Sequence, residues 1–343
     1  MSHPSPGEIP LPFKLSRMVA SLWVPQAIYV AAALGIPDLL AKGPMRSAEI
    51  ARVVEANPDA VHRLMRALVV LEIATQSDDG TFALAALGEC LRSDTRDSMR
   101  AWALLWGGDL MWPRWGHMLD SIRTGISAPQ LLDGRERFDD IAAHPAEQVH
   151  FYDSMMQLTR QIAGALVMSY DFAWVSHVVD VGGGYGQLLP PILAANPAVR
   201  ATVFDLPDCR AGALRLFEKT GLAERMSFVA GDMFEGVPPG ADLYLLKSVI
   251  HDWDDERSIA ILRSCRAAMG ANARLLILEW LMPERVSPSD QMIVGTDLNM
   301  LVMVGGRERT DADYRALASA AGLEVARIVP TPAGMSIIET VAA

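Results

Sequence analysis

Short apolar runs alternate with longer stretches of helical character from Val178 to the end of the chain. The runs are rich in Val, Ile, Leu and Phe and have the length of strands. Because strands that alternate with helices are typical of a parallel sheet, this half is predicted to be an α/β domain. The predicted strands span 178–181, 201–205, 226–230, 242–247, 273–279, 323–329 and 335–341.

Three helices of this half are marked by residues at their ends. The stretch from Leu188 to Ala195 predicts a helix whose two prolines are tolerable only in its first turn. A second helix is predicted to begin at Asp255 and to stop at Gly270. A third is predicted to start at Thr310, where Asp313 would complete a capping box.

The first half of the chain is predicted to be mostly helical. Residues 13–34 are predicted to form one long helix with Ala, Val, Ile and Trp on nearly every face. Such a helix must be covered all round, which suggests a partner subunit. Residues 44–92 have the pattern of a winged helix, in which two short strands flank the turn Ser77–Gly80. Ser47 is expected to cap the first helix of this motif, and Asn57 the second.

Between the two halves lie an aromatic segment, a loop and a helix. Residues 101–119 hold four of the eight tryptophans, which suit either core packing or the wall of an aromatic substrate pocket. Residues 125–140 are predicted to be a loop with a short turn, and residues 144–169 a helix. The first twelve residues include four prolines and are predicted to be a tail.

Composition limits the classes of partner. At 343 residues two domains are expected, and 51% hydrophobic residues supply ample material for a packed core. A net charge of −11 argues against nucleic acid and anionic membranes, which require basic patches. Three scattered cysteines make neither a disulfide framework nor a metal cluster, so a cytoplasmic location is expected.

Two segments favour other functions when taken alone. The winged-helix pattern permits DNA binding, but between residues 44 and 92 seven acidic residues outnumber five basic ones, whereas phosphate contacts need the opposite sign. Residues 19–37 carry no charge and loosely resemble a signal peptide or membrane span, but Pro25 and Gln26 interrupt them. A buried helix at a subunit interface is the better account, and no membrane partner is expected.

A glycine-rich turn follows the first predicted strand. Gly182, Gly184 and Gly186 allow the backbone to bend tightly and a ligand to approach closely. A dinucleotide site would place its third glycine at the next position, but Gln187 stands there, so pyrophosphate binding is disfavoured. Three successive predicted strands carry acids at or near their ends, which suits a nucleoside without phosphate. These acids are Asp180, Asp205, at the distance expected of a ribose-binding carboxylate, and Asp232.

Five motifs in a fixed order carry a family resemblance: Asp-Val-Gly-Gly-Gly-Tyr-Gly, Phe-Asp-Leu-Pro, Gly-Asp-Met-Phe, Leu-Leu-Lys-Ser-Val-Ile-His-Asp-Trp and Gly-Gly-Arg-Glu-Arg-Thr. Together they resemble the S-adenosylmethionine-dependent small-molecule O-methyltransferases, a group that includes plant caffeate-type and bacterial polyketide-tailoring enzymes. The resemblance covers nearly the whole chain.

The resemblance implies a homodimer in which a mostly helical winged-helix dimerisation domain precedes a Rossmann-like class I methyltransferase domain. The expected divisions are a dimerisation domain at 1–115, a helical connector that lines the substrate pocket at 116–170, and the catalytic domain at 171–343.

The resemblance also implies positions for the ligands, which are S-adenosylmethionine, its product S-adenosylhomocysteine and an aromatic small molecule. The expected cofactor-binding residues are Thr159, Asp180, Gly182, Gly184, Asp205, Leu206, Asp232, Met233, Lys247 and Trp253. The expected substrate-binding residues are Phe151, Met155, Met156, Asn299 and Met303.

The expected catalytic residues lie near the strand ends and the loops beside them. The resemblance implies that His251 is the general base and that Glu279 and Glu308 hold its ring. A phenol titrates near ~10 and histidine near ~6.5, so the proton must leave as the new bond forms. A carboxylate on Nδ1 fixes the tautomer that leaves Nε2 free to accept. No metal motif is found, and no metal is expected.

Other interpretations of these residues remain open. A lone histidine is more often structural, Glu308 could pair with Arg307 or Arg309, and residues 252–256 could be a solvated acidic helix start. Methylation of nitrogen or carbon, or a drifted non-methylating reaction, is the alternative within the fold. A cofactor-sensing winged-helix regulator and a nicotinamide dehydrogenase are the remaining alternatives.

Overall fold

The computed structural model describes residues 9–135 and 137–343, which form two compact units. One unit holds the described residues up to Trp112 together with Ala146–Gln157, and the other holds Pro113–Pro145 with Leu158–Ala343. The predicted proline-rich tail falls mostly on residues 1–8, which lie outside the described residues, but Leu11 and Pro12 begin a helix instead. Among the described helices, none combines the length and the apolarity that crossing a membrane requires.

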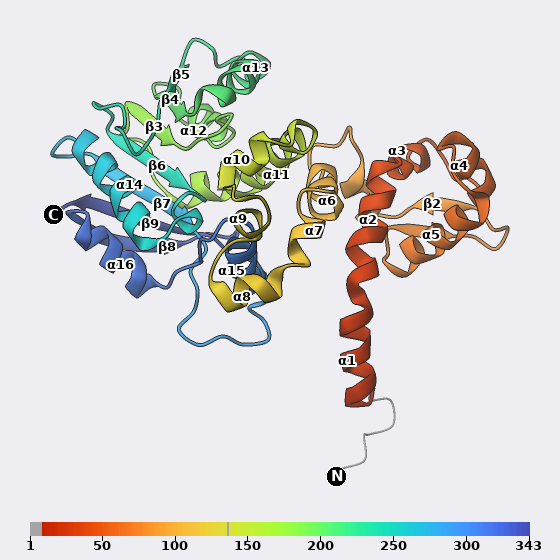
Figure 1. Cartoon of the computed structure of the whole chain (residues 1–343). Coiled ribbons are helices and arrows are strands. Elements are labelled where there is room, and N and C mark those ends of the chain that lie inside the picture. Colours follow the sequence, from red (N-terminus) through yellow and green to blue (C-terminus); the bar gives the residue numbers. More distant parts are fainter. Residues whose placement is uncertain (1–8, 136) are drawn as a thin grey trace. The chain divides into compact units, whose positions relative to one another are not determined.

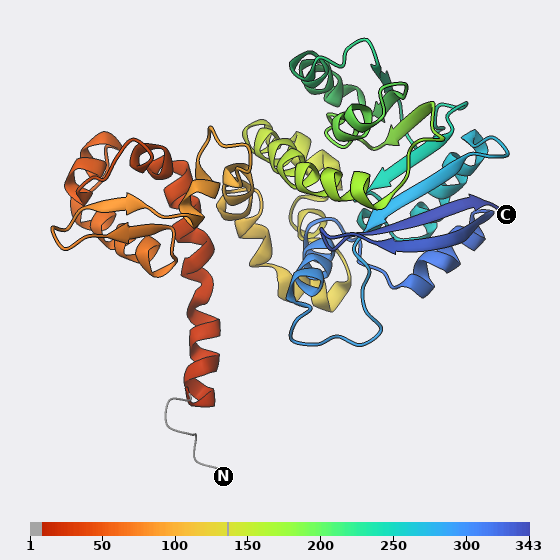
Figure 2. The same ribbon diagram turned by 180° about the vertical axis from the view of Figure 1, so that it is seen from behind.

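A long helical rod opens the first unit. The helix α1 (Leu11–Val19), the 3-10 turn η1 (Ala20–Leu22) and α2 (Trp23–Ala33) follow one another without a break (Figures 1 and 2). The second half of the rod is anchored, since Gln26 Nε2 donates to the Gly107 carbonyl at 3.0 Å and α2 buries Ala27, Ala31 and Ala32. No residue of α1 is buried. The predicted helix is confirmed, and its first half is left uncovered by the described chain.

The predicted winged-helix pattern is confirmed in the same unit. The hairpin strands pair antiparallel, with Thr75 opposite Ala83, and Asn57 Oδ1 caps the second helix through the Ala60 N–H at 3.0 Å. The elements are α3 (Ile36–Leu40), α4 (Ser47–Val53), α5 (Pro58–Val70), β1 (Ala74–Gln76), β2 (Phe82–Leu84), η2 (Leu87–Leu91) and α6 (Arg100–Gly107).

The expected cap at Ser47 is wrong. Ser47 is the first residue of α4, and its hydroxyl lies 3.1 Å from His62 Nδ1 on α5. The N-cap is Arg46, whose backbone N–H donates to Glu49 Oε2 at 2.8 Å. A serine beside a helix start can bond to a neighbouring helix instead of its own backbone, which a local sequence pattern does not reveal.

The segment between the two halves is more helical than predicted. Residues 125–140 do not form a loop with a short turn: one helix lies within them and ends at Gly134 in the left-handed conformation, and a second helix begins at Arg137. Such short helices carry too few apolar positions to show a period. The elements are α7 (Trp112–Trp115), α8 (Met118–Thr124), α9 (Ala128–Asp133), α10 (Arg137–Ala142) and α11 (Pro145–Ser169).

A seven-stranded sheet organises the second unit, in the order β5-β4-β3-β6-β7-β9-β8. The first five strands are parallel, whereas β9 runs antiparallel to both neighbours. All seven predicted strands are present, each end within one residue. Their bounds are β3 (His177–Val181), β4 (Arg200–Asp205), β5 (Met226–Ala230), β6 (Leu243–Lys247), β7 (Arg274–Glu279), β8 (Leu323–Pro330) and β9 (Ser336–Ala342).

Helices cover this sheet. α14 (Asp255–Ala268) and α16 (Asp311–Ala320) lie side by side over one face (Figure 1), where Ile261 and Leu262 are fully buried against the strands. Burying each such side chain stabilises the fold by about 1.5–3 kcal/mol. The remaining elements are α12 (Leu189–Ala195), η3 (Pro207–Cys209), α13 (Arg210–Thr220), η4 (Ile250–Asp252) and α15 (Gln291–Met303).

The strand order fixes where a ligand can bind. From β3 the chain moves outward through β4 and β5, and then returns to the other side of β3 to form β6. At such a switch point the loops that leave neighbouring strands diverge and open a crevice beyond their carboxyl ends. The glycine turn and the segment carrying His251 follow β3 and β6, so both are placed at this crevice.

Candidate active site

The turn after β3 has the backbone conformation that its glycines predict. Gly182, Gly184 and Gly186 have φ angles of 67°, 58° and 81°, in the region that side chains other than glycine rarely adopt. A Cβ on Gly182 would lie 3.0 Å from Val249 Cγ2, so the turn also packs closely on the segment after β6. The turn therefore presents bare backbone at the switch point.

Two carboxylates flank this turn. Asp205 Oδ2 accepts from the Gly184 N–H at 2.6 Å, and its Oδ1 accepts from the Leu206 N–H at 2.7 Å. Asp180 is 2% exposed, and its Oδ2 has no hydrogen-bond partner among the described residues. Burial raises the pKa of Asp180 to about 7, although Lys247 acts to lower it. A buried, unpartnered carboxylate oxygen beside glycine amides suits a polar, positively charged ligand.

The segment after β5 lies near an aromatic pair. The rings of Phe234 and Trp253 meet edge to face, with centroids 4.8 Å apart. Met233 and Trp253 both pack, half-buried, against the core beneath the sheet. Asp232 is exposed, and its Oδ1 accepts from the Phe234 N–H at 2.8 Å. This side of the crevice offers aromatic and thioether surface for a flat ring.

His251 is held between two buried glutamates. Its Nδ1 lies 2.8 Å from Glu308 Oε1 and 3.5 Å from Glu279 Oε2. The other oxygen of Glu279 accepts from the backbone N–H groups of Val249, Ile250 and His251, at 3.1, 3.0 and 3.3 Å. Glu279 therefore fixes the backbone of the segment, while Glu308 fixes the imidazole ring. A carboxylate on Nδ1 directs Nε2 toward a substrate.

The charges around the ring favour its protonated form. Burial alone would lower the pKa of His251, but Glu279, Glu308 and Asp252 together raise it to about 10. Burial also raises the pKa of Glu279 to about 7, an effect that His251 opposes. An imidazole that has accepted a proton is thus strongly stabilised at this position.

The same three side chains are the one set, within the described ranges, whose ligand atoms lie close enough to hold a metal ion. These atoms lie within 4.8 Å of one another. The 2.8 Å separation between His251 Nδ1 and Glu308 Oε1 is that of a hydrogen bond, so a shared proton accounts for the arrangement.

The arginines beside Glu308 have other partners. Glu308 does not pair with Arg307 or Arg309, because both arginines form ion pairs with Asp255 at the start of α14. The acidic helix start is therefore not merely solvated. Asp254 caps α14 by accepting from the Arg257 N–H at 2.8 Å. Apart from a possible pairing with Glu308, the sequence predicts no role for Arg309, whose one signal is its place in the motif that ends at Thr310.

The expected substrate residues fall into two groups. Asn299 and Met303 lie on α15, where Asn299 Oδ1 accepts from Trp115 Nε1 at 3.3 Å. Phe151, Met155 and Met156 lie half-buried on α11, in the stretch that belongs to the first compact unit. Their roles stay predictions.

The remaining expected cofactor residues differ in exposure. Thr159 is buried on the part of α11 that belongs to the second unit, Leu206 is exposed after β4, and Lys247 is half-buried at the end of β6. Burial lowers the pKa of Lys247, which Glu279 and Asp180 oppose. Lys247 thus interacts electrostatically with both groups of carboxylates at the crevice.

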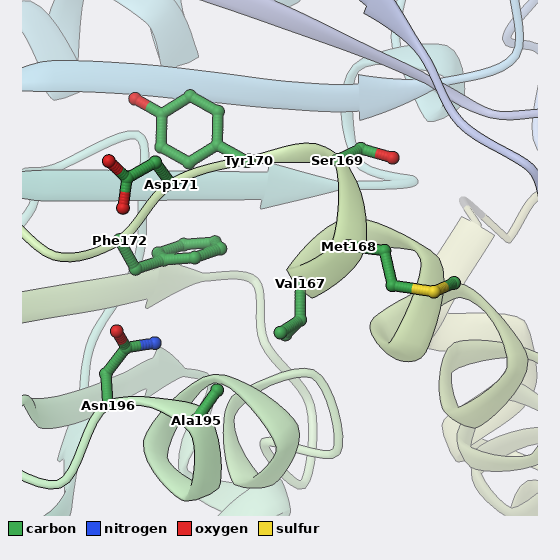
Figure 3. A pocket seen from close by; sticks show the side chains of 8 residues that line it. All are labelled: Val167, Met168, Ser169, Tyr170, Asp171, Phe172, Ala195 and Asn196. Atoms are coloured by element: carbon green, nitrogen blue, oxygen red, sulfur yellow. The ribbon is translucent and has the colours of Figure 1, made fainter.

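A separate hollow lies away from these residues. Figure 3 shows its lining, residues 167–172 with Ala195 and Asn196, around a volume of about 360 Å³. Residues 167–172 precede β3 and the other two end α12, whereas the glycine turn follows β3. None of the expected site residues lines it.

Known proteins resemble the chain along its length. Residues 115–324 match the family described as the O-methyltransferase domain, and residues 16–94 match the O-methyltransferase dimerisation domain. The chain is 38% identical to a phenazine O-methyltransferase of Lysobacter antibioticus, over 97% of each chain. It is 32% identical to an 8-amino-8-demethylriboflavin N,N-dimethyltransferase of Streptomyces davaonensis, over 98% of each.

A solved structure extends the comparison to bound ligands. The chain resembles an O-methyltransferase of neocarzinostatin biosynthesis solved with S-adenosylmethionine and 2-hydroxy-5-methyl naphthoic acid. The two share 34% identity and a TM-score of 0.80, with 98% of this chain and 100% of that one covered.

Proposed function

The chain belongs to the family of S-adenosylmethionine-dependent O-methyltransferases, and we propose that it methylates a phenolic hydroxyl of an aromatic secondary metabolite. In this proposal His251 is the general base. The observation that carries the base assignment is the 2.8 Å hydrogen bond between His251 Nδ1 and Glu308 Oε1. It orients the ring so that Nε2 is the nitrogen available to a substrate.

The residues around the glycine turn fit the cofactor. The unpartnered oxygen of Asp180 offers an acceptor for its amino group, and Asp205, held by the Gly184 amide, offers one for its ribose hydroxyls. Met233 and Trp253 would contact its adenine ring. The full proposed set is Thr159, Asp180, Gly182, Gly184, Asp205, Leu206, Asp232, Met233, Lys247 and Trp253. When bound, S-adenosylmethionine supplies an electrophilic methyl group.

The buried cluster performs the proton chemistry. Nε2 of His251 takes the phenol proton, which makes the oxygen a stronger nucleophile as it is methylated. Glu308 on Nδ1 keeps the tautomer in which Nε2 can accept, and the negative charges of Glu279 and Glu308 stabilise the resulting imidazolium. Because the pKa of His251 is raised to about 10, the ring must first release a proton at neutral pH, so activity should increase with pH.

The substrate site and the domain roles complete the proposal. Phe151, Met155, Met156, Asn299 and Met303 would contact a flat aromatic acceptor, since methionine adapts to varied ring shapes. Residues 1–115 would form the dimerisation domain of a homodimer, 116–170 the connector and 171–343 the catalytic domain. A cytoplasmic location is part of the proposal, supported by three cysteines that are all free.

Calorimetry with S-adenosylhomocysteine, with NADH as the control ligand, tests the cofactor assignment. Micromolar binding of S-adenosylhomocysteine alone is expected. Phenols are then screened for gain of a methyl group, first with the unmodified enzyme and then with His251→Ala. Binding of NADH alone would overturn the reading of the glycine turn, and full turnover by the His251→Ala variant would overturn the base.

A further inference from the structure

The hydrogen bond that orients the base joins two segments that are distant in sequence. His251 lies in η4 after β6, whereas Glu308 lies in the stretch between α15 and α16. Their side chains belong to independent loops, so the 2.8 Å contact between them depends on how accurately one loop is held against the other. The contacts that fix this register involve neither of the two side chains.

The two backbones touch directly. The Arg307 N–H donates to the His251 carbonyl at 2.8 Å. A Cβ on Gly306 would lie 2.1 Å from that carbonyl oxygen and 2.6 Å from the carbonyl carbon of Asp252, so only glycine permits this approach. Because the φ angle of Gly306 is not positive, close packing is the reason for glycine here.

The side chain of Arg309 adds four hydrogen bonds to three acceptors in the stretch from η4 to the start of α14. Its Nη1 donates to the Ile250 carbonyl at 2.9 Å and its Nη2 to the Trp253 carbonyl at 2.6 Å. Its Nε and Nη2 also donate to Asp255 Oδ1, at 3.1 and 2.9 Å. The acceptors lie on both sides of His251 along the chain, so one guanidinium spans the whole turn.

Arg309 is also tied to the strand of the second glutamate. Its carbonyl accepts from the Met282 N–H at 2.9 Å, and its backbone pairs with Leu281, two residues beyond Glu279 at the end of β7. The Arg309 side chain is 1% exposed. One residue therefore connects the segments that carry His251, Glu308 and Glu279.

We propose that Arg309 is a positioning residue for the base, and that with Gly306 it sets the register that brings Glu308 to His251 Nδ1. The inference rests on the proposed function of His251. A planar guanidinium can donate to several acceptors in a fixed geometry, whereas a lysine ammonium on its flexible stem cannot. Arg309→Lys therefore keeps the positive charge beside Asp255 and removes the fixed geometry.

The matched control is Arg307→Gln. Arg307 lies in the same loop and pairs with the same Asp255, but its side chain is largely exposed and its contact with His251 is made by the backbone. The variants are compared with the full-length enzyme for kcat, for the pH dependence of kcat, for affinity for S-adenosylhomocysteine by calorimetry, and for the thermal midpoint.

We expect Arg309→Lys to lower kcat roughly 10- to 100-fold, as a small misplacement of a catalytic group does. Affinity for S-adenosylhomocysteine should stay within about twofold, since Arg309 acts on the base. The rising limb of kcat against pH should move to lower pH, because a looser Glu308 stabilises the imidazolium less. Arg307→Gln should leave kcat within about threefold and the limb unchanged.

Asp255→Asn is the second variant, for the case that Arg309→Lys does not fold. Asp255 is half-exposed and anchors the Arg309 guanidinium, so its loss should move the limb in the same direction with a smaller fall in kcat. If Arg309→Lys, or Asp255→Asn in its place, has the kcat of the unmodified enzyme and the same rising limb of kcat against pH, the positioning role is wrong. A fall in kcat matched by an equal loss of cofactor affinity also overturns it.

His251→Ala separates this inference from the proposed function. If His251→Ala is inactive while Arg309→Lys behaves like Arg307→Gln, the base stands and the positioning role fails. If His251→Ala retains full turnover, the proposed function fails first, and with it the role of Arg309.

Discussion

Two regions of this protein depart from the usual rule of burial in opposite directions. α1 exposes apolar side chains, with Phe13 66%, Leu15 62% and Met18 64% exposed, and buries none. The crevice beyond β3 and β6 buries charged ones, with Glu279 fully buried and Glu308 only 5% exposed. An exposed apolar surface favours association with another protein surface, whereas buried charges cost stability unless they are paired.

The difference shows which kind of evidence each region supplies. On α1 the burial of apolar side chains is incomplete, because the described chain does not cover them. A second copy of the chain packed on α1 would explain their exposure. At the crevice the arrangement is more nearly complete, because one oxygen of Glu279 accepts from three backbone amides and one oxygen of Glu308 lies at hydrogen-bond distance from His251 Nδ1. The first region can be tested by placing a charge on its apolar surface, and the second by removing or replacing single side chains.

The largest effect is expected at His251, the proposed base. His251→Ala should lower turnover on a phenol by roughly 10²- to 10⁴-fold, because the proton then has no positioned acceptor. Affinity for S-adenosylhomocysteine should change little. His117→Ala, at the half-exposed residue just before α8, is the matched control and should retain activity. Turnover unchanged in His251→Ala would exclude the histidine as the base.

A smaller effect is expected at Asp205, the proposed acceptor for the ribose hydroxyls. Asp205→Ala removes the acceptor that the Gly184 amide holds, so affinity for S-adenosylhomocysteine should fall roughly 10- to 100-fold in calorimetry. Asp208→Ala, at an exposed carboxylate three positions on, should bind normally. Equal affinity in the two variants would show that Asp205 does not contact the ligand.

The next effect concerns the apolar helix. Met18→Glu places a charge on the surface that we propose a second copy covers, so the dimer dissociation constant should rise roughly tenfold or more. Ser16→Glu, a polar position on the same exposed helix, is the control. Sedimentation measures both, and a dimer indifferent to Met18→Glu would place the interface elsewhere.

The smallest expected change is a shift in pH dependence. The carboxylate of Glu308 helps to raise the pKa of His251 to about 10, so activity should rise with pH through the neutral range into the alkaline range. In Glu308→Gln the pKa of His251 should be lower, which moves the rising limb to lower pH even though the maximal rate falls. Single-turnover rates measured across pH would reveal the shift, and an unmoved limb would contradict it.

Much of the fold was predictable because its signals are local. Each strand is a run of apolar residues closed by polar ones, and the capping pair Thr310 and Asp313 is read from spacing alone. The helices α9 and α10 are too short to show a period, so the sequence does not predict them, and the cap expected at Ser47 fails because the partner of Ser47 is on another helix.

The candidate site was predictable only where the chemistry of a side chain points to a role. His251, Glu279 and Glu308 could be proposed from the motifs, since carboxylates and imidazoles are chemically distinctive. Arg309 could not, because two of its partners are the carbonyls of Ile250 and Trp253, and every residue has a carbonyl. The role of Gly306 is equally hidden in the sequence, because its close contact with the segment after β6 forms only when the two loops pack together.

The position of β9 in the sheet has a consequence for synthesis. β9 is the last strand in sequence, yet it lies between β7 and β8, and it pairs with β7 from Leu275 to Glu279. On the ribosome, β7 therefore emerges long before its outer neighbour exists. Glu279, at the end of β7, pairs with Ser336 of β9, so it gains support on that side only after residue 336 has left the exit tunnel. The surroundings of the proposed base are therefore completed late in synthesis.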